Sequence, residues 1–506
     1  MKLINFNIFE NIFVFLSPEL FILYFIILSL IFFLYVYSMK DFFFPRLLKG
    51  VFVVSLFVVF IIFNLVWNFL NIEFIILNNH FIVNNYCLLF KFLILFAFFL
   101  FLLIGYFYFI DEVSIVYEYT IVLWLSFLSL FVLVSSNDFL LLFLALELQG
   151  LSAYVLTTAK IKNNYSTEAG LKYFTLNSYA TGLALFGISL LYGITGTTNF
   201  TDFQEFFALD VLNNSMFSIS CVSILLILTA LFFKLTAAPF HFWAVDVYEG
   251  SPSGTMFFFF FVPKIAILQL LFNLTLNIFF PFSEIILYFF YVSIIASVII
   301  GAFGALFELK VKRLLVYSGI SNVGFLLINY FLFAFYGLEA LFFYLIIYII
   351  VQCSFFIVFF VVKRYNFDSS FSKIKYIEDF ISLVFANPLL AFILTISIFS
   401  LSGIPPLAGF FTKLLVFFNI IKSSLLLFAF VLIFLNFASY IYYVRFIRTV
   451  ILDNFFTNYN WHFFKSLTWV SSFFIFIFFM KNIIFFIFGL SLLSILKFFL
   501  IYACSV

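Results

Sequence analysis

Charged residues are scarce in this chain. Only 9% of its 506 residues are Asp, Glu, Lys or Arg, whereas 67% are hydrophobic. A water-soluble fold needs far more polar surface than this composition supplies. The apolar runs also repeatedly exceed the roughly 20 residues that cross a bilayer as a helix. The composition therefore excludes a soluble protein and predicts a polytopic membrane protein.

Residues and motifs that hold cofactors are equally rare. The chain has three histidines and four cysteines, and the cysteines lie too far apart for a zinc or iron–sulfur motif. The cysteines are Cys87, Cys221, Cys353 and Cys504. His80 and His462 stand in polar segments without ligand spacing, and no glycine-rich phosphate or dinucleotide motif is present. The net charge of +2 is too small to indicate nucleic-acid binding. We expect neither a metal nor a redox cofactor in this chain.

The N-terminal segment MKLINFNIFENIF has one lysine, no arginine and no small-residue cleavage site. It therefore resembles neither a transit peptide nor a cleaved signal peptide. The excess of Phe, Ile, Tyr and Asn is also typical of codon use in an AT-rich genome. Together these features favour an organelle-encoded protein.

Apolar stretches bounded by turn and charge signals predict about 14 transmembrane helices. Their centres lie near Ile26, Val59, Phe99, Trp124, Ala145, Ala184, Thr229, Leu268, Ile294, Ser321, Ile347, Ile396, Phe434 and Phe485. We expect an all-α membrane protein with two inverted repeats of five helices, spans 4 to 8 in residues 111–280 and spans 9 to 13 in residues 281–450. Three spans in residues 1–110 precede the repeats, and a loop and helix in residues 451–506 follow them.

Basic residues gather in the loops that follow odd-numbered spans. They are Lys40, Arg46, Lys49, Lys160, Lys162, Lys172, Lys310, Lys312, Arg313, Lys363, Arg364, Lys373, Lys375, Arg445 and Arg448. The other loops carry mainly acidic residues, such as Glu73, Asp202 and Glu284. Because loops on the cytoplasmic or matrix side carry the excess of Lys and Arg, both termini are expected on the opposite face.

Two spans are expected to be broken. Span 7 contains LFFKLTAAPFHFW, where Pro239 removes a backbone donor and frees the carbonyl of Leu235. Span 12 contains SLSGIPPLAGFF, which a regular helix does not accommodate. Irregular backbone at membrane depth is tolerated inside protein or beside a hydrated cavity, and a pair of broken spans is typical of transporters with inverted repeats. A proline kink packed by neighbouring helices is the alternative for either span alone.

Four charged residues lie in the middle of apolar spans: Glu147, Lys234, Lys264 and Lys413. A charge at the bilayer centre costs at least about 2.5 to 3.5 kcal/mol, which indicates a functional pathway or a partner. Lys234 precedes the break at Pro239, so we expect it near the freed carbonyls, and it is the natural cation for Glu147. Two structural alternatives to a functional role remain. Glu147 could be a neutral acid that joins helices by hydrogen bonds, and Lys413 could be a cation that caps a helix end.

His241 lies beside the first break, where it either relays protons or holds the loop by a hydrogen bond. Asp246 and Glu249 follow it and are expected at the membrane interface. Glu19, two residues after Ser17, suits the first turn of span 1 because an acid there is stabilised by the helix dipole.

Six segments, in a constant order from about residue 110 to 450, resemble the antiporter-like membrane subunits of NADH:ubiquinone oxidoreductase, respiratory complex I. They are LFLALELQGLSAYVL, LKYFTLNSYATGLALFGISLLYGITG, LFFKLTAAPFHFWAVDVYEGSPS, VPKIAIL, KVKRLLVYSGISNVGFLL and SLSGIPPLAGFFTKLLVF. Within that family the chain is similar to one branch, because it carries lysine in both span 8 and span 12. Members of another branch tend to carry Glu in span 12, and members of a third branch are longer.

The resemblance implies that Glu147, Lys234, Lys264 and Lys413 carry protons from the mitochondrial matrix to the intermembrane space. It implies a place in the mitochondrial inner membrane beside other membrane-arm subunits, especially antiporter-like ones. It also implies that NADH, FMN, iron–sulfur clusters and ubiquinone are bound by partner subunits. One departure is Asn322, where many relatives have His; because Asn does not titrate, we expect it to hold a water molecule at most.

Two other classes share parts of this pattern. A subunit of a multisubunit cation/proton antiporter has much of the same lysine and glutamate pattern but uses an ion gradient instead of NADH oxidation. A purely structural membrane scaffold would tolerate neutralisation of the four charged residues. Copurifying flavin and iron–sulfur subunits would favour complex I, and sodium-dependent proton flux without them would favour the antiporter.

The charge distribution predicts that the loop from Lys363 to Lys375 faces the matrix or cytoplasm. A Ser369→Cys variant should react with a membrane-impermeant thiol reagent from that side, and an Asp202→Cys variant should react from the other. The unsubstituted chain gives the background of the native cysteines. Labelling of Ser369→Cys from the opposite side alone would reverse the topology.

Overall fold

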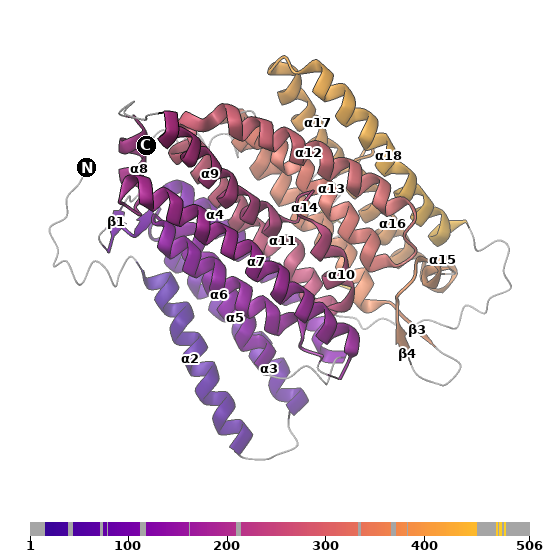
Figure 1. Cartoon of the computed structure of the whole chain (residues 1–506). Coiled ribbons are helices and arrows are strands. Elements are labelled where there is room, and N and C mark those ends of the chain that lie inside the picture. Colours follow the sequence, from indigo (N-terminus) through magenta and orange to yellow (C-terminus); the bar gives the residue numbers. More distant parts are fainter. Residues whose placement is uncertain are drawn as a thin grey trace. The chain divides into compact units, whose positions relative to one another are not determined.

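The computed structural model describes residues 16–38, 44–70, 74–77, 79–111, 118–160, 162–208, 214–331, 335–365, 371–381 and 383–452, with short pieces at 472–473, 475–477 and 480–481 (Figure 1). The chain divides into two compact units. Unit 1 comprises Met1–Leu235 and Gly250–Ile286, and unit 2 comprises Thr236–Glu249 and Leu287–Val506.

Unit 1 is built from long helices with one small hairpin. Its elements are α2 (Ser17–Ser38), α3 (Phe44–Trp67), β1 (Phe74–Ile76), β2 (Phe81–Val83), α4 (Asn85–Asp111), α5 (Glu118–Ser135), α6 (Phe139–Thr157), α7 (Asn164–Thr195), α8 (Phe200–Ala208), α9 (Asn214–Leu235), α11 (Ser253–Asn273), the π-helix η1 (Leu274–Ile278) and the 3-10 helix η2 (Phe280–Phe282). The strands β1 and β2 pair antiparallel.

Unit 2 contains a second set of helices. Its elements are α10 (Phe242–Gly250), α12 (Ser283–Leu306), α13 (Val311–Phe331), α14 (Phe335–Val361), β3 (Lys363–Tyr365), β4 (Phe371–Lys373), η3 (Ile377–Phe380), α15 (Leu383–Ala386), α16 (Pro388–Ser402), α17 (Ala408–Lys422) and α18 (Leu426–Ile451). The strands β3 and β4 form an antiparallel hairpin. Gly250 of α10 and the first four residues of α12, 283–286, fall to unit 1.

In the described part of the chain, 12 helices are long and apolar enough to cross a membrane, and Pro388–Ser402 is a shorter apolar helix. Each of these segments contains one predicted centre, from Ile26 to Phe434. The prediction of an all-α polytopic membrane fold is therefore confirmed. The last predicted span, centred near Phe485, lies outside the described residues, and the five-helix repeats stay a prediction.

The most deeply buried helix of unit 1 is α11, in which every residue from Ser253 to Phe272 is buried. It packs against α4, α5 and α9. Aromatic side chains fill the space between these helices; the rings of Phe98 and Phe127, for example, stack 4.2 Å apart. A helix that is apolar on all sides is stable only when surrounded in this way, so Lys264 on α11 lies deep inside the protein.

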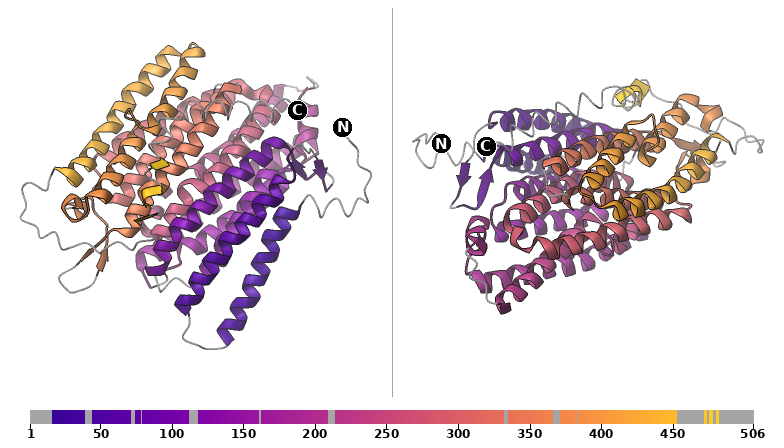
Figure 2. Two further views of the ribbon diagram at one scale, coloured as in Figure 1. Left: turned by 180° about the vertical axis from the view of Figure 1, so that it is seen from behind. Right: turned by 90° about the horizontal axis from the view of Figure 1, so that it is seen from above.

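The helices α5, α6 and α7 run side by side (Figure 1). The Asp138 side chain caps α6 by accepting from Leu140 N at 3.0 Å, and Asn163 caps α7 in the same way. Gly187 lets α7 approach α9 closely, because a Cβ there would lie 2.7 Å from Ser223 O. These local features place α6, α7 and α9 against one another. By contrast, α2 and α3 lie together at one side of unit 1 (Figure 2). They carry many exposed apolar side chains, as expected of helices that face lipid.

Both predicted breaks are present. In span 7 the helix α9 ends at Leu235, Thr236 takes a positive φ of 65°, and α10 begins at Phe242. In span 12 the helix α16 ends at Ser402, Gly403 takes a φ of 81°, and α17 begins at Ala408. Gly403 suits this left-handed position because it has no Cβ.

Candidate functional site

Lys234 lies in the last turn of α9, directly before the first break, and it is 6% exposed. Its Nζ donates to Leu146 O at 2.7 Å and to Gln149 Oε1 at 3.0 Å, both on α6. The acceptors therefore come from the neighbouring helix rather than from the carbonyls freed by the break. Both acceptors are neutral groups.

Glu147 lies on the same helix, α6, and is partly exposed. No ion pair joins its carboxylate to Lys234 in the part of the chain that the structure describes, but the carboxylate is near enough to attract the Lys234 ammonium electrostatically. The Glu147–Lys234 interaction is thus a longer-range attraction instead of a direct salt bridge. Its role in function stays a prediction.

Asn177 on α7 is a buried polar residue that the sequence analysis did not single out. Its Nδ2 donates to the hydroxyl of Tyr154 at 2.5 Å. A Cβ on Gly150 would lie 2.7 Å from Asn177 Nδ2 and 3.7 Å from Lys234 Nζ. Gly150 therefore leaves the space in which Asn177 and Lys234 approach each other. The position of Asn177 within an apolar span is the signal that could have identified it.

Lys264 follows Pro263 inside α11 and is 3% exposed. Its Nζ lies 5.6 Å from the centre of the Phe260 ring. No hydrogen-bond acceptor for this amine lies among the residues described. Because no carboxylate lies within helical reach of it in the sequence, Lys264 is expected to need a partner from another span, water or a neutral state. The apolar surrounding is consistent with water or a neutral state.

Lys413 lies in the second turn of α17, beyond the break in span 12. Its Nζ donates to Ser402 O at 2.7 Å and to Asn436 Oδ1 at 2.8 Å. Ser402 ends α16, so this bond is the helix-capping contact considered above, whereas Asn436 comes from α18, a different span. Gly409 allows the close crossing of α16 and α17, because a Cβ there would lie 1.7 Å from Ser400 O.

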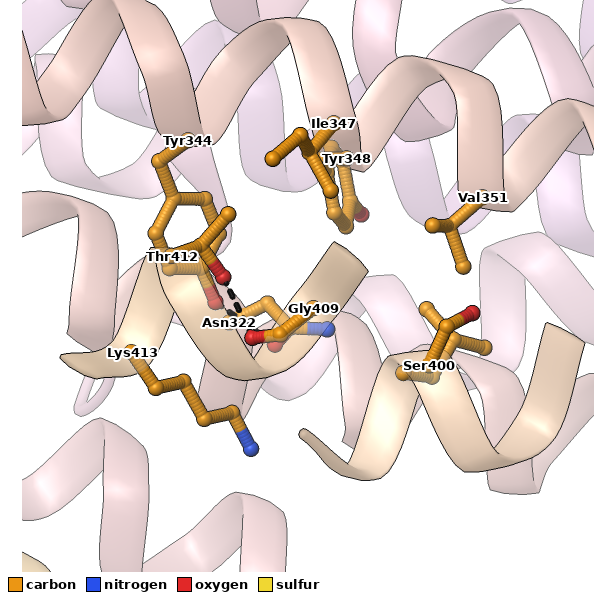
Figure 3. Close-up of a pocket in the computed structure, with 10 residues that line it drawn as sticks. Asn322, Tyr344, Ile347, Tyr348, Val351, Ser400, Gly409, Thr412 and Lys413 are labelled. Carbon is orange, nitrogen blue, oxygen red and sulfur yellow. Dashed lines mark hydrogen bonds between the residues drawn. The ribbon is translucent and has the colours of Figure 1, made fainter. Parts of the chain in front are cut away.

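A cavity of about 20 Å³ adjoins Lys413 and is lined by residues of α13, α14, α16 and α17 (Figure 3). The Tyr344 hydroxyl donates to Asn322 Oδ1 at 3.0 Å, and Asn322 Nδ2 has no protein partner among the described residues. A volume of roughly 10 to 15 Å³ suffices for one water molecule. The cavity therefore has the room and a free donor for a single water beside Lys413.

His241 stands in the chain segment that links α9 to α10 and is buried, and its Nδ1 has no hydrogen-bond partner in the described ranges. The relay and loop-holding interpretations of this residue therefore both stay open.

Glu249, at the end of α10, accepts hydrogen bonds from Lys310 and Arg313 near the start of α13. Burial alone raises the pKa of Glu249, but these two cations outweigh it and hold the pKa below its ordinary value. The bond to Glu249 in turn raises the pKa of Lys310. The predicted interfacial acid is thus an anchor that holds α10 to α13.

The described residues contain no group of three or more His, Cys, Asp or Glu that could hold a metal ion. A polytopic helical fold with two broken spans and buried lysines is typical of membrane transport proteins. Residues 136–439 match the family model described as NADH:quinone oxidoreductase/Mrp antiporter, TM. The chain belongs to this family.

Two sequence relatives agree with this assignment. The chain is 38% identical to NADH-ubiquinone oxidoreductase chain 2 of Marchantia polymorpha over 348 residues, which are 68% of this chain and 69% of the relative. It is 35% identical to NADH-quinone oxidoreductase subunit N of Erythrobacter litoralis over 344 residues, 67% of each chain.

Two solved structures share the fold. A chain of respiratory complex I from Thermus thermophilus superposes with a TM-score of 0.73 at 22% identity, covering 94% of this chain and 98% of that one. A chain of the Mrp complex from Dietzia superposes with a TM-score of 0.69 at 20% identity, covering 86% and 79%.

The contact between Lys413 and Asn436 can be tested directly. Asn436→Leu should lower the stability of the detergent-solubilised protein by about 1 to 3 kcal/mol, because it removes one acceptor from a buried amine. Thermal unfolding of the solubilised complex measures this change. Phe437→Leu, an exposed site on the same helix, is the matched control. Equal midpoints for the two variants would contradict the assigned contact.

Proposed function

We propose that this chain carries protons across the membrane as a subunit of the membrane arm of NADH:quinone oxidoreductase, of the type named chain 2 in mitochondria and subunit N in bacteria. One observation carries the proposal: Lys234 and Lys413 are buried and each is held by one backbone carbonyl and one side-chain amide oxygen. A lysine paired with a carboxylate is kept charged, whereas neutral acceptors allow the amine to lose and regain a proton.

Glu147 supplies the switch in this proposal. A charge change that arrives from a neighbouring subunit alters the attraction between Glu147 and Lys234. If the switch brings the two charges to about 4 Å, closer than they lie in this structure, they interact by roughly 4 kcal/mol at an effective dielectric constant of about 20, which corresponds to about a thousandfold change in proton affinity. An effect of this order is sufficient for Lys234 to release its proton, which Lys264 and Lys413 then take up in turn.

The energy for transport comes from outside this chain. NADH, FMN, iron–sulfur clusters and ubiquinone are assigned to partner subunits, and the neighbours in the membrane are other antiporter-like subunits. The proposed location is the mitochondrial inner membrane, with transport from matrix to intermembrane space. The composition of the chain and its likeness to the Marchantia protein support this location.

A multisubunit cation/proton antiporter is the second candidate, which the fold shared with the Dietzia Mrp chain supports. Purification from the native membrane distinguishes the two. Flavin and iron–sulfur subunits in the purified complex support the NADH-driven enzyme. Proton flux that depends on a sodium gradient, in a complex without such subunits, supports the antiporter.

Glu147→Gln keeps the shape of the side chain but removes its charge. We expect the complex to assemble and NADH-driven proton uptake to fall, because Lys234 loses the anion that controls its protonation. Proton uptake by reconstituted vesicles, measured per NADH oxidised, gives the result. Glu168→Gln, on the exposed surface of α7, is the control. Unchanged uptake in Glu147→Gln would remove the switch from the proposal.

Lys413→Arg distinguishes a helix cap from a proton carrier. Arginine keeps its proton across the working pH range, so a carrier should lose turnover while the complex still assembles. A cap should keep full activity in Lys413→Arg, and Lys413→Ala should then cost only about 1 kcal/mol of stability. Proton uptake and thermal stability of both variants separate these outcomes. Normal uptake in Lys413→Arg would leave Lys234 and Lys264 to carry the relay.

A further inference from the structure

Three polar atoms converge on the side of α6 where Gly150 carries no side chain. A Cβ there would lie 2.7 Å from Asn177 Nδ2, 3.4 Å from the Tyr154 hydroxyl oxygen and 3.7 Å from Lys234 Nζ. The three groups belong to α7, α6 and α9, all within unit 1. A polar group inside a membrane bundle is costly without a partner. Their gathering around one glycine indicates that the three groups act on one another.

Asn177 fixes the position of the Tyr154 hydroxyl. The asparagine is fully buried, and its Nδ2 donates to the hydroxyl oxygen at 2.5 Å. Its Oδ1 is also buried and has no hydrogen-bond partner in the part of the chain that the structure describes. A phenolic hydroxyl both donates and accepts hydrogen bonds. The bond from Asn177 uses one lone pair of the oxygen and leaves the hydroxyl hydrogen and the second lone pair for other partners.

Lys234 turns an unused bonding position towards these groups. A lysine ammonium has three N–H donors. Two of those of Lys234 bond to Leu146 O and Gln149 Oε1, and the third has no acceptor among the described residues. In the neutral amine a lone pair stands in place of the third N–H and accepts a proton. On the Gly150 side of α6, the polar groups near Nζ are the Tyr154 hydroxyl and the Asn177 amide.

Tyr154 lies between Lys234 and the matrix end of α6 in the expected topology. It stands three residues before Thr157, where α6 ends, a rise of about 5 Å along the helix axis. Two lysines follow in the next loop, which is expected on the matrix face. A side chain on a helix leans towards the helix start, so the Tyr154 hydroxyl reaches back to Gly150. The Tyr154 side chain is partly exposed, whereas Lys234 is buried.

The titratable groups near the Tyr154 hydroxyl come from three helices. They are Glu147 on α6, Tyr173 on α7 and Lys234 on α9. Glu147 is near enough to act electrostatically on both Tyr154 and Lys234. A negative charge there favours the arrival of a proton at the neutral Lys234 amine.

We propose that Tyr154 is the hydroxyl through which Lys234 regains its proton from the matrix side, with Asn177 as its positioning residue. The neutral amine takes the hydroxyl hydrogen, in direct contact or through one bridging water, while the hydroxyl oxygen takes a proton from matrix water. One O–H bond breaks as another forms, so Tyr154 is neutral before and after the step and Lys234 gains one positive charge. The step refills Lys234 after its proton has passed to Lys264, and it therefore rests on the proposed function.

A hydrogen bond that merely joins α6 to α7 is the alternative. Tyr154→Phe removes the hydroxyl and keeps the ring, which packs edge-on against Tyr173 and Phe174. We expect this variant to assemble and its NADH-driven proton uptake to fall severalfold in reconstituted vesicles with the matrix face outward. The loss should grow as the external pH rises, because proton delivery limits the rate when protons are scarce. Tyr179→Phe, an exposed site on α7, is the matched control.

Asn177→Leu should show the same pH-dependent loss, because the hydroxyl is no longer held in place. The double variant Tyr154→Phe, Asn177→Leu should lose no more than Tyr154→Phe alone, since both residues act through one hydroxyl. Thermal unfolding of each purified complex is measured beside uptake. Normal uptake in Tyr154→Phe at every pH overturns the proposal, and so does a loss that is equal at every pH and accompanied by a lower midpoint.

If Tyr154→Phe does not assemble, the pH dependence of assembled Asn177→Leu decides in the same way. Failure of both single variants to assemble shows a structural bond and also overturns the proposal. Lys234→Met is measured in parallel. Loss of uptake in Lys234→Met with normal uptake in Tyr154→Phe rejects this inference alone, whereas normal uptake in Lys234→Met rejects the proposed function.

Discussion

The free-energy cost of burying a lysine ammonium away from water is the constraint on which the rest of this structure depends. A charged amine buried at membrane depth needs acceptors, and the carbonyls of regular helices there are already used within the helix. The chain meets this need locally in two ways. Lys413 takes the last carbonyl of a helix that has been interrupted, Ser402 O, and Lys234 takes a carbonyl and a side-chain amide from the helix beside it. The break in span 12 meets this requirement directly, and the close crossing of α16 and α17 at Gly409 brings Lys413 to the carbonyl of Ser402.

Glycines make this arrangement possible because backbone and lysine side chains must share a small space. Gly150 stands where a Cβ would displace Asn177, and Gly409 stands where a Cβ would collide with Ser400 O. A larger residue at position 409 would separate α17 from α16, which supplies an acceptor to Lys413, and a larger residue at position 150 would displace the Asn177 side chain beside Lys234. The packing of α6 with α7 and of α16 with α17 is therefore part of the site and not merely its support.

The spans and their breaks were predictable because each depends on local sequence. Long apolar runs reveal transmembrane helices without any knowledge of their neighbours, and the segments around Pro239 and from Gly403 to Pro406 carry local signals that disfavour a regular helix. Glu147, Lys234, Lys264 and Lys413 were also found in this way, since a charge within an apolar run is visible in one dimension.

The partners of those charges were not predictable, because they depend on helices that are far apart in sequence. In the sequence, Asn436 and Asn177 are ordinary polar residues within apolar spans. Only the structure shows that Asn436 contacts the amine of Lys413 and that Asn177 contacts the hydroxyl of Tyr154. Glu19 was assigned a role at a helix start, which is locally correct. Its bond to Lys91, 72 residues away, is a tertiary contact that no local pattern reports.

The acceptor sets of Lys234 and Lys413 have a consequence that follows from counting hydrogens. A lysine ammonium carries three N–H donors and the neutral amine carries two. Each of these lysines has two protein acceptors among the described residues. In the proposed relay, the hydrogen that departs is therefore the one without a protein acceptor, and the neutral amine has enough hydrogens for both of its bonds. The proposed relay thus needs no change of rotamer at either lysine: the nitrogen can stay in place while the proton moves.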